Sequence, residues 1–94
     1  MNVYVIIESI QEHNTYKHGE HTKCDVLGVY ENLKQAQTYM KQYANDTRAH
    51  RNKYKSGDHK GVMFLNNPNW ITLQDSDYLN GYDIDYKLIE KEIQ

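Results

Sequence analysis

Histidine and cysteine side chains cluster in one short segment near the N-terminus. His13, His18, His21 and Cys24 form the pattern H-x4-H-x2-H-x2-C. These donor types can hold Zn²⁺ tetrahedrally. Structural zinc sites usually place two close ligand pairs far apart in sequence, whereas this chain has one uneven cluster. We therefore expect a histidine-rich loop with Cys24 packed at the start of a strand, and no metal or cofactor. A small metal-dependent enzyme built on His18 and His21 is kept as a third alternative.

Enzyme motifs are otherwise weak. His13-x-Thr15 matches half of a two-histidine phosphoesterase motif, but the chain has no second His-x-Thr or His-x-Ser. The five glycines are scattered and form no phosphate-binding loop, and no spacing locates a nucleophile. The sequence therefore predicts a protein without catalytic activity.

A basic segment follows the middle of the chain. Residues 41–61 carry six Lys or Arg and two Asp. Cations attract phosphates, and a tyrosine ring can stack on a base. One interpretation is a solvated helix end and loop, another is a surface for a protein. A third is a binding site for nucleic acid or a signalling nucleotide, formed by Arg48, Arg51, Lys53, Tyr54 and Lys55.

An acidic segment ends the chain, since residues 74–94 carry six acids and two Lys. Asp75-x-Asp77 lacks the Gly and Glu of a calcium-binding loop. A wet strand face is one interpretation. The functional interpretation that we favour is an acidic, tyrosine-containing surface that meets a basic groove on a protein partner. Its expected residues are Asp75, Asp77, Tyr82, Asp83 and Asp85.

The whole chain has the size and composition of one small domain. It has 94 residues and a net charge of −2, with 26% charged residues, nine Tyr, one Trp and one Phe. The aromatic residues supply the apolar area that disordered chains lack. Cys24 is the single cysteine, so no intramolecular disulfide can form. The apolar run Val3–Ile7 is too short for a signal peptide or a membrane span, which favours a soluble, cytoplasmic protein. We expect one domain over residues 1–94.

Alternation and spacing predict the elements that position these residues. Val3–Ile10 has the apolar pattern of a central strand, and Cys24–Tyr30 that of a second strand with Val26, Gly28 and Tyr30 on one face. Gly28 within a strand indicates a bulge or a close backbone approach. The polar stretch 11–23 between the strands is expected to be a long, mobile hairpin loop.

One helix is predicted after the second strand. Asn32 is a favoured N-cap and Gln35 completes a capping-box pattern. An apolar stripe follows at helical spacing, formed by Leu33, Ala36, Met40, Tyr43 and Ala44. The helix end is left open between Thr47 and Lys55.

Two further apolar runs lie within an insertion-like region, residues 48–80, on both sides of Asn66-Asn67-Pro68-Asn69. Val62–Leu65 and Trp70–Leu73 form either a hairpin or one strand interrupted by a turn. From Tyr82 to Leu88 apolar and polar residues alternate, as in a strand with one buried face. The sequence thus predicts an α+β fold in β-β-α-β-β order, with one helix packed on one face of a small antiparallel or mixed sheet.

The core pattern resembles small uncharacterised β-β-α-β proteins of phages and bacteria. The resemblance covers residues 2–45 and 82–90, and residues 48–80 are longer than usual for that pattern. It is carried by Val3-Tyr4-Val5-Ile6, by Leu27-Gly28-Val29-Tyr30-Glu31-Asn32 with Ala36 and Tyr39, and by Tyr82-Asp83-Ile84-Asp85-Tyr86. It implies a fold and gives no functional residue. Phage domains of this size often act by binding, including inhibitors of host defence such as anti-CRISPR proteins.

The sequence-based hypothesis is therefore a non-enzymatic phage or mobile-element protein that inhibits a host protein, such as a defence nuclease complex. The alternative is a nucleic-acid or nucleotide-binding protein that uses the basic segment. An uncovered sheet face in a two-layer domain would also leave a homodimer open.

Overall fold

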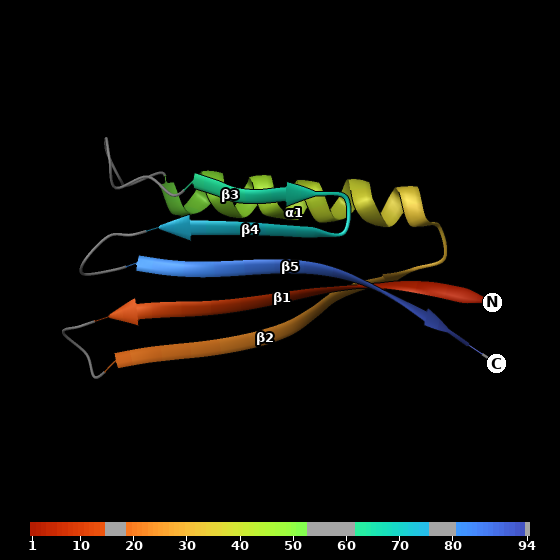
Figure 1. The fold of residues 1–94 in the computed structure, drawn as a ribbon, viewed down its shortest axis with the longest axis horizontal. Coiled ribbons are helices and arrows are strands. Elements are labelled where there is room, and N and C mark those ends of the chain that lie inside the picture. Colours follow the sequence, from red (N-terminus) through yellow and green to blue (C-terminus); the bar gives the residue numbers. More distant parts are fainter. Residues whose placement is uncertain (15–18, 53–61, 76–80, 94) are drawn as a thin grey trace.

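A computed structural model describes residues 1–14, 19–52, 62–75 and 81–93, and it shows one five-stranded sheet and one helix (Figure 1). The strands are β1 (Asn2–Asn14), β2 (Gly19–Tyr30), β3 (Val62–Asn67), β4 (Trp70–Asp75) and β5 (Gly81–Glu92), and the helix is α1 (Leu33–Asn52). Strand order in the sheet is β2-β1-β5-β4-β3, and every neighbouring pair is antiparallel. The α+β class with a single sheet is confirmed.

The predicted β-β-α-β-β order is wrong by one strand, because the structure has β-β-α-β-β-β. The two apolar runs at 62–75 form a hairpin, β3–β4, with Pro68 and Asn69 at its turn. Proline cannot donate a ladder hydrogen bond, so it ends one strand and lets the next begin. The Asn69 amide donates to Asn67 Oδ1 at 3.1 Å, which stabilises the turn. No parallel pair is present among the described strands, so the mixed sheet is excluded for them.

The predicted loop over 11–23 is also wrong for most of its length. β1 runs to Asn14 and β2 starts at Gly19, with His13 paired to Glu20 and Gln11 to Thr22. Strand pairing satisfies the backbone hydrogen bonds, so the two strands can extend here without an alternating pattern of apolar side chains. Residues 15–18 lie outside the described part of the chain.

α1 begins as the sequence predicts. The backbone amide of Gln35 donates to Asn32 Oδ1 at 2.9 Å, which confirms Asn32 as the N-cap. The helix continues beyond Thr47 to Asn52, so Arg48 and Arg51 are helical; residues 53–61 are not described. The spacing of four residues places Ala36, Met40 and Ala44 on the side of α1 that faces the sheet, and all three are fully buried.

The core lies between α1 and one face of the sheet. β5 supplies Tyr82, Ile84 and Tyr86, which are at most 1% exposed, while Asp83 and Asp85, on the opposite face, are half-buried. Ile6 of β1 joins this cluster, and so do Ile71 and Leu73 of β4. The predicted alternation of the last strand is thus confirmed.

A polar contact fastens the C-terminal half of α1 to the sheet. The Tyr86 hydroxyl donates to Glu8 Oε2 on β1 at 2.6 Å and lies 2.6 Å from Thr47 Oγ1 on α1. Because the phenol has one proton, Thr47 is the donor in the second contact. Burial, followed by the Glu8 carboxylate, raises the pKa of Tyr86 well above 10. Tyr86 therefore links β5, β1 and α1 as a neutral phenol.

Tyr86→Phe removes both contacts and leaves a half-buried carboxylate without its donor. We expect the free energy of unfolding to fall by about 1–3 kcal/mol, measured by urea denaturation at pH 7. The raised pKa means that the folded state holds the phenol proton more tightly. The contribution of Tyr86 to stability is therefore complete below pH 10 and declines as the pH rises above it. The difference between the two proteins should accordingly shrink at higher pH. Tyr39→Phe, at an exposed position, is the matched control and should cost less than 0.5 kcal/mol, about the limit for surface changes.

A β-bulge interrupts the β1–β2 pair. Ile6 pairs with Gly28 and Ile7 with Val26, so Leu27 is the extra residue of β2. The expected bulge at Gly28 is confirmed, and so is the close approach. A Cβ atom on Gly28 would lie 2.7 Å from both Cε2 and the hydroxyl oxygen of Tyr30. Only glycine leaves room for this ring, which also stacks on Tyr39 at 5.1 Å between centroids.

Gly28→Ala should therefore force the Tyr30 ring off its site. We expect a loss of about 1–2 kcal/mol in the free energy of unfolding, typical of overpacking. In a Tyr30→Ala background the same change should be neutral or slightly stabilising, because alanine restricts the unfolded chain. Equal losses in the two backgrounds would contradict the close approach.

Candidate functional site

The sheet face opposite α1 has an unusual mixture of apolar and acidic side chains. Strand register places on it every second residue of β1, β4 and β5 and, through the bulge, both valines of β2. We call this surface the open face. Its described members include Val5, Ile7, Val26, Val29, Trp70, Thr72, Asp83, Asp85, Lys87 and Ile89.

The bulge decides which residues of β2 reach the open face. Simple alternation would put Val26 and Val29 on opposite faces, as the sequence suggested. The extra residue Leu27 shifts the phase, so that Val29 pairs with Val5 and Val26 with Ile7. Leu27 itself packs against the core. The prediction for Val26 is therefore wrong, because periodicity cannot show where a bulge changes the phase.

One end of the open face is apolar. Val29, Val5 and Ile89 lie side by side on β2, β1 and β5. Val26 and Ile7 form the next row. Val26 is 62% exposed, Val29 57% and Ile89 38%, values that are high for aliphatic side chains in strands. Within the ranges described, α1 is the one helix and packs on the other face, so these side chains stay accessible.

A polar cluster around Trp70 borders this apolar end. Trp70 Nε1 donates to Asp85 Oδ1 at 3.1 Å, and the Thr72 hydroxyl donates to the same oxygen at 2.6 Å. Lys87 Nζ lies 4.6 Å from the centroid of the Trp70 ring, a cation–π contact. The indole is still 42% exposed. Asp85 thus orients an accessible aromatic ring.

Only part of the predicted acidic surface is brought together here. Asp83 and Asp85 lie on the open face, whereas Tyr82 faces α1, is 1% exposed and has the Arg51 guanidinium 4.8 Å from its ring centroid. Tyr82 therefore cannot be part of an exposed binding surface. Asp75 ends β4 at the position paired with Tyr82, and Asp77 lies outside the described residues.

Of the predicted basic site, Arg48 and Arg51 lie in the described chain. Arg51 Nη2 lies 2.9 Å from Glu12 Oε1, and its side chain is only 26% exposed. This ion pair and the Tyr82 contact fix the last turn of α1 to the sheet. Arg48 is half-buried on the same helix. The other three predicted residues lie outside the part of the chain that the structure describes: Lys53, Tyr54 and Lys55. The sequence could not show this use of Arg51, because Glu12 is distant in the chain.

The histidine cluster is likewise only partly described. The expectation that Cys24 packs at the start of a strand is wrong, because β2 already begins at Gly19 and Cys24 is exposed within it. His13 and His21 lie on β1 and β2, and His18 is not described. Over residues 1–14, 19–52, 62–75 and 81–93, no three metal-binding side chains come together. In the same ranges, no helix is long and apolar enough to span a membrane.

A tyrosine cluster lies on the helix side of β2. Tyr30 stacks on Tyr39 and is hydrogen-bonded to Tyr43. This hydrogen bond, with burial and the neighbouring phenols, raises the pKa of Tyr30 to about 12. Tyr30 is therefore neutral at physiological pH and contributes to the cluster by packing and hydrogen bonding.

Comparison of the chain with protein-family models, curated proteins and solved structures found no match.

Asp85→Ala tests the Trp70 cluster directly. Trp70 is the single tryptophan, so its fluorescence reports this site alone. Loss of the shared acceptor should shift the emission to longer wavelength, increase acrylamide quenching and lower the free energy of unfolding by about 1–2 kcal/mol. Asp83→Ala, two residues away on the same face, is the control and should leave the emission unchanged. An unchanged spectrum in Asp85→Ala would show that the carboxylate does not orient the ring.

Proposed function

We propose that this protein is a non-enzymatic binding protein whose open face docks on the basic surface of a protein partner. The observation that carries the proposal is the exposed apolar end of the open face, where Val26, Val29 and Ile89 are accessible, next to the Trp70 cluster. Exposed apolar patches next to polar groups mark interaction surfaces on small proteins. An accessible, pre-oriented indole is a typical interface anchor.

Charge selects the class of partner. Asp85 and Asp83 lie on the same face, two and four residues along β5 from Lys87, which is in the row of Ile7 and is held against the indole. A partner with cationic side chains at the rim and an apolar centre would complement this arrangement. Surfaces that bind nucleic acid carry such cations. A host nuclease or another nucleic-acid-binding protein, inhibited by occupation of its basic groove, is therefore the partner that we propose.

Val26→Arg tests the proposal, because it places a cation at the apolar end of the open face. Val26 is already exposed, so the substitution should cost little stability. The tagged protein is incubated with bacterial lysate, with and without nuclease, and partners are quantified by mass spectrometry. We expect the unmodified protein to capture one protein partner in stoichiometric amount, with or without nuclease. Val26→Arg and Asp83→Lys should each capture at least about 10-fold less of this partner. Asp46→Lys, an equal charge reversal on the exposed side of α1, should retain it.

Three outcomes would overturn the proposal. One is a partner captured equally by Val26→Arg, and another is capture of nucleic acid alone. The third is a dimer, measured by light scattering, that becomes monomeric in Val26→Arg, because the open face would then bind a second copy of this chain.

A further inference from the structure

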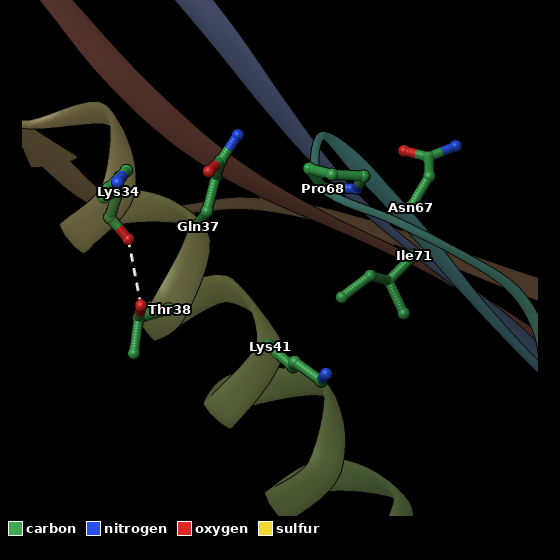
Figure 2. A pocket seen from close by; sticks show the side chains of 7 residues that line it. All are labelled: Lys34, Gln37, Thr38, Lys41, Asn67, Pro68 and Ile71. Carbon is green, nitrogen blue, oxygen red and sulfur yellow. Dashed lines mark hydrogen bonds between the residues drawn. The ribbon is translucent and has the colours of Figure 1, made fainter.

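A groove of about 540 Å³ lies between α1 and the β3–β4 turn (Figure 2). It is on the helix side of the sheet, so it shares no residue with the open face. Small-molecule sites usually have volumes of about 300–1,000 Å³. The residues that line it are Lys34, Gln37, Thr38, Lys41, Asn67, Pro68 and Ile71.

Helical spacing builds one wall of the groove. Four of the lining residues share one face of α1, because they are three or four positions apart: Lys34 from Gln37 and Thr38, and Lys41 from the same two. The Thr38 hydroxyl donates to the Lys34 carbonyl at 2.9 Å, which keeps it close to the helix. The long side chains of both lysines are left to reach outward.

The β3–β4 turn provides the opposite wall. Gln37 Nε2 donates to Asn69 Oδ1 at 3.0 Å, and the Leu88 amide donates to the Asn69 carbonyl at 2.9 Å. The turn is therefore held by α1 on one side and by β5 on the other. In Figure 2 the Ile71 side chain points from β4 toward the helix, and it is 2% exposed. The groove thus has fixed walls and an apolar floor.

The charge of the groove is positive. Lys34 and Lys41 line it and no carboxylate does. Neither lysine pairs with a carboxylate of the described chain, in contrast to Arg51 and Lys23, which lie 2.9 and 3.3 Å from acidic oxygens. The two lysines are seven residues apart, about 10 Å along the helix axis. Their flexible side chains can converge on one anionic group or bind two neighbouring groups.

We propose that this groove binds a nucleoside phosphate. Lys34 and Lys41 would bind the phosphates, and the base would lie over the exposed ring of Pro68. The Asn67 side chain lies at the rim, where its Oδ1 is held by the Asn69 backbone amide and its Nδ2 can donate to the edge of a base. The site differs from the basic segment that the sequence suggested, and it does not depend on the partner proposed for the open face.

Titration of the ¹⁵N-labelled protein with AMP, ADP and ATP, followed by NMR, tests the proposal. We expect saturable shifts confined to the amides of residues 34–41 and 67–71, with affinity rising with the number of phosphates. Adenosine and inorganic phosphate should each bind more weakly. Lys34→Gln and Lys41→Gln should each weaken binding about 10-fold, as expected when one charge-assisted hydrogen bond is lost.

Lys91→Gln is the matched control, since it removes one positive charge from an exposed position on β5. An equal loss of affinity in Lys91→Gln would show general charge attraction and overturn the proposal. Shifts that fall outside the groove would overturn it as well, and so would binding of a single-stranded oligonucleotide without binding of any mononucleotide. Because Lys34 and Lys41 are far from Val26, none of these results bears on the open face.

Discussion

The contact of the Tyr86 hydroxyl with Glu8 and Thr47 fixes how the two layers of this protein fit together. It joins the central strands β1 and β5 to α1 through one buried phenol. Around it, Met40 and Ala44 pack on Ile84 and Ile6, and Arg51 closes the end of the layer over Tyr82. With the helix fixed on this face, the opposite residues of every strand must lie on the other face. The open face is therefore a consequence of helix docking.

The second constraint is the bulge at Leu27. It changes the phase of β2 so that Val26 and Val29 both join the open face, while Leu27 packs inward. Gly28 makes room for the Tyr30 ring at the same point. The extra residue thus adds a second valine to the apolar end of the open face, and the tyrosine cluster packs on the opposite side of β2. A strand without the bulge would direct one of the two valines toward the helix layer.

Local patterns in the sequence predict local structure well here. The Asn32 cap and the alternation from Tyr82 to Tyr86 each depend on neighbouring residues and are confirmed. The predicted helical stripe is confirmed for Ala36, Met40, Tyr43 and Ala44, whereas Leu33, in the first turn, is 40% exposed. The polar end of the β1–β2 hairpin was mistaken for a loop, because backbone pairing gives no side-chain pattern there. The functional surfaces depend on distant residues. Sheet register brings Trp70 to Asp85, and helix docking brings Gln37 to Asn69. Helix docking also pairs the Arg51 guanidinium with the Glu12 carboxylate.

The two ends of the described chain also meet. The Ile93 amide donates to the Met1 carbonyl at 2.7 Å, and N and C lie at the same end of the molecule in Figure 1. Since β1 and β5 are antiparallel neighbours at the centre of the sheet, a short peptide joining these ends would complete a continuous β5–β1–β2 meander. The fold therefore permits circular permutation, with new ends opened elsewhere and the central pair made covalent. In such a permuted chain the two strands that form most of the core would become neighbours in sequence, which would lower the contact order and favour faster folding.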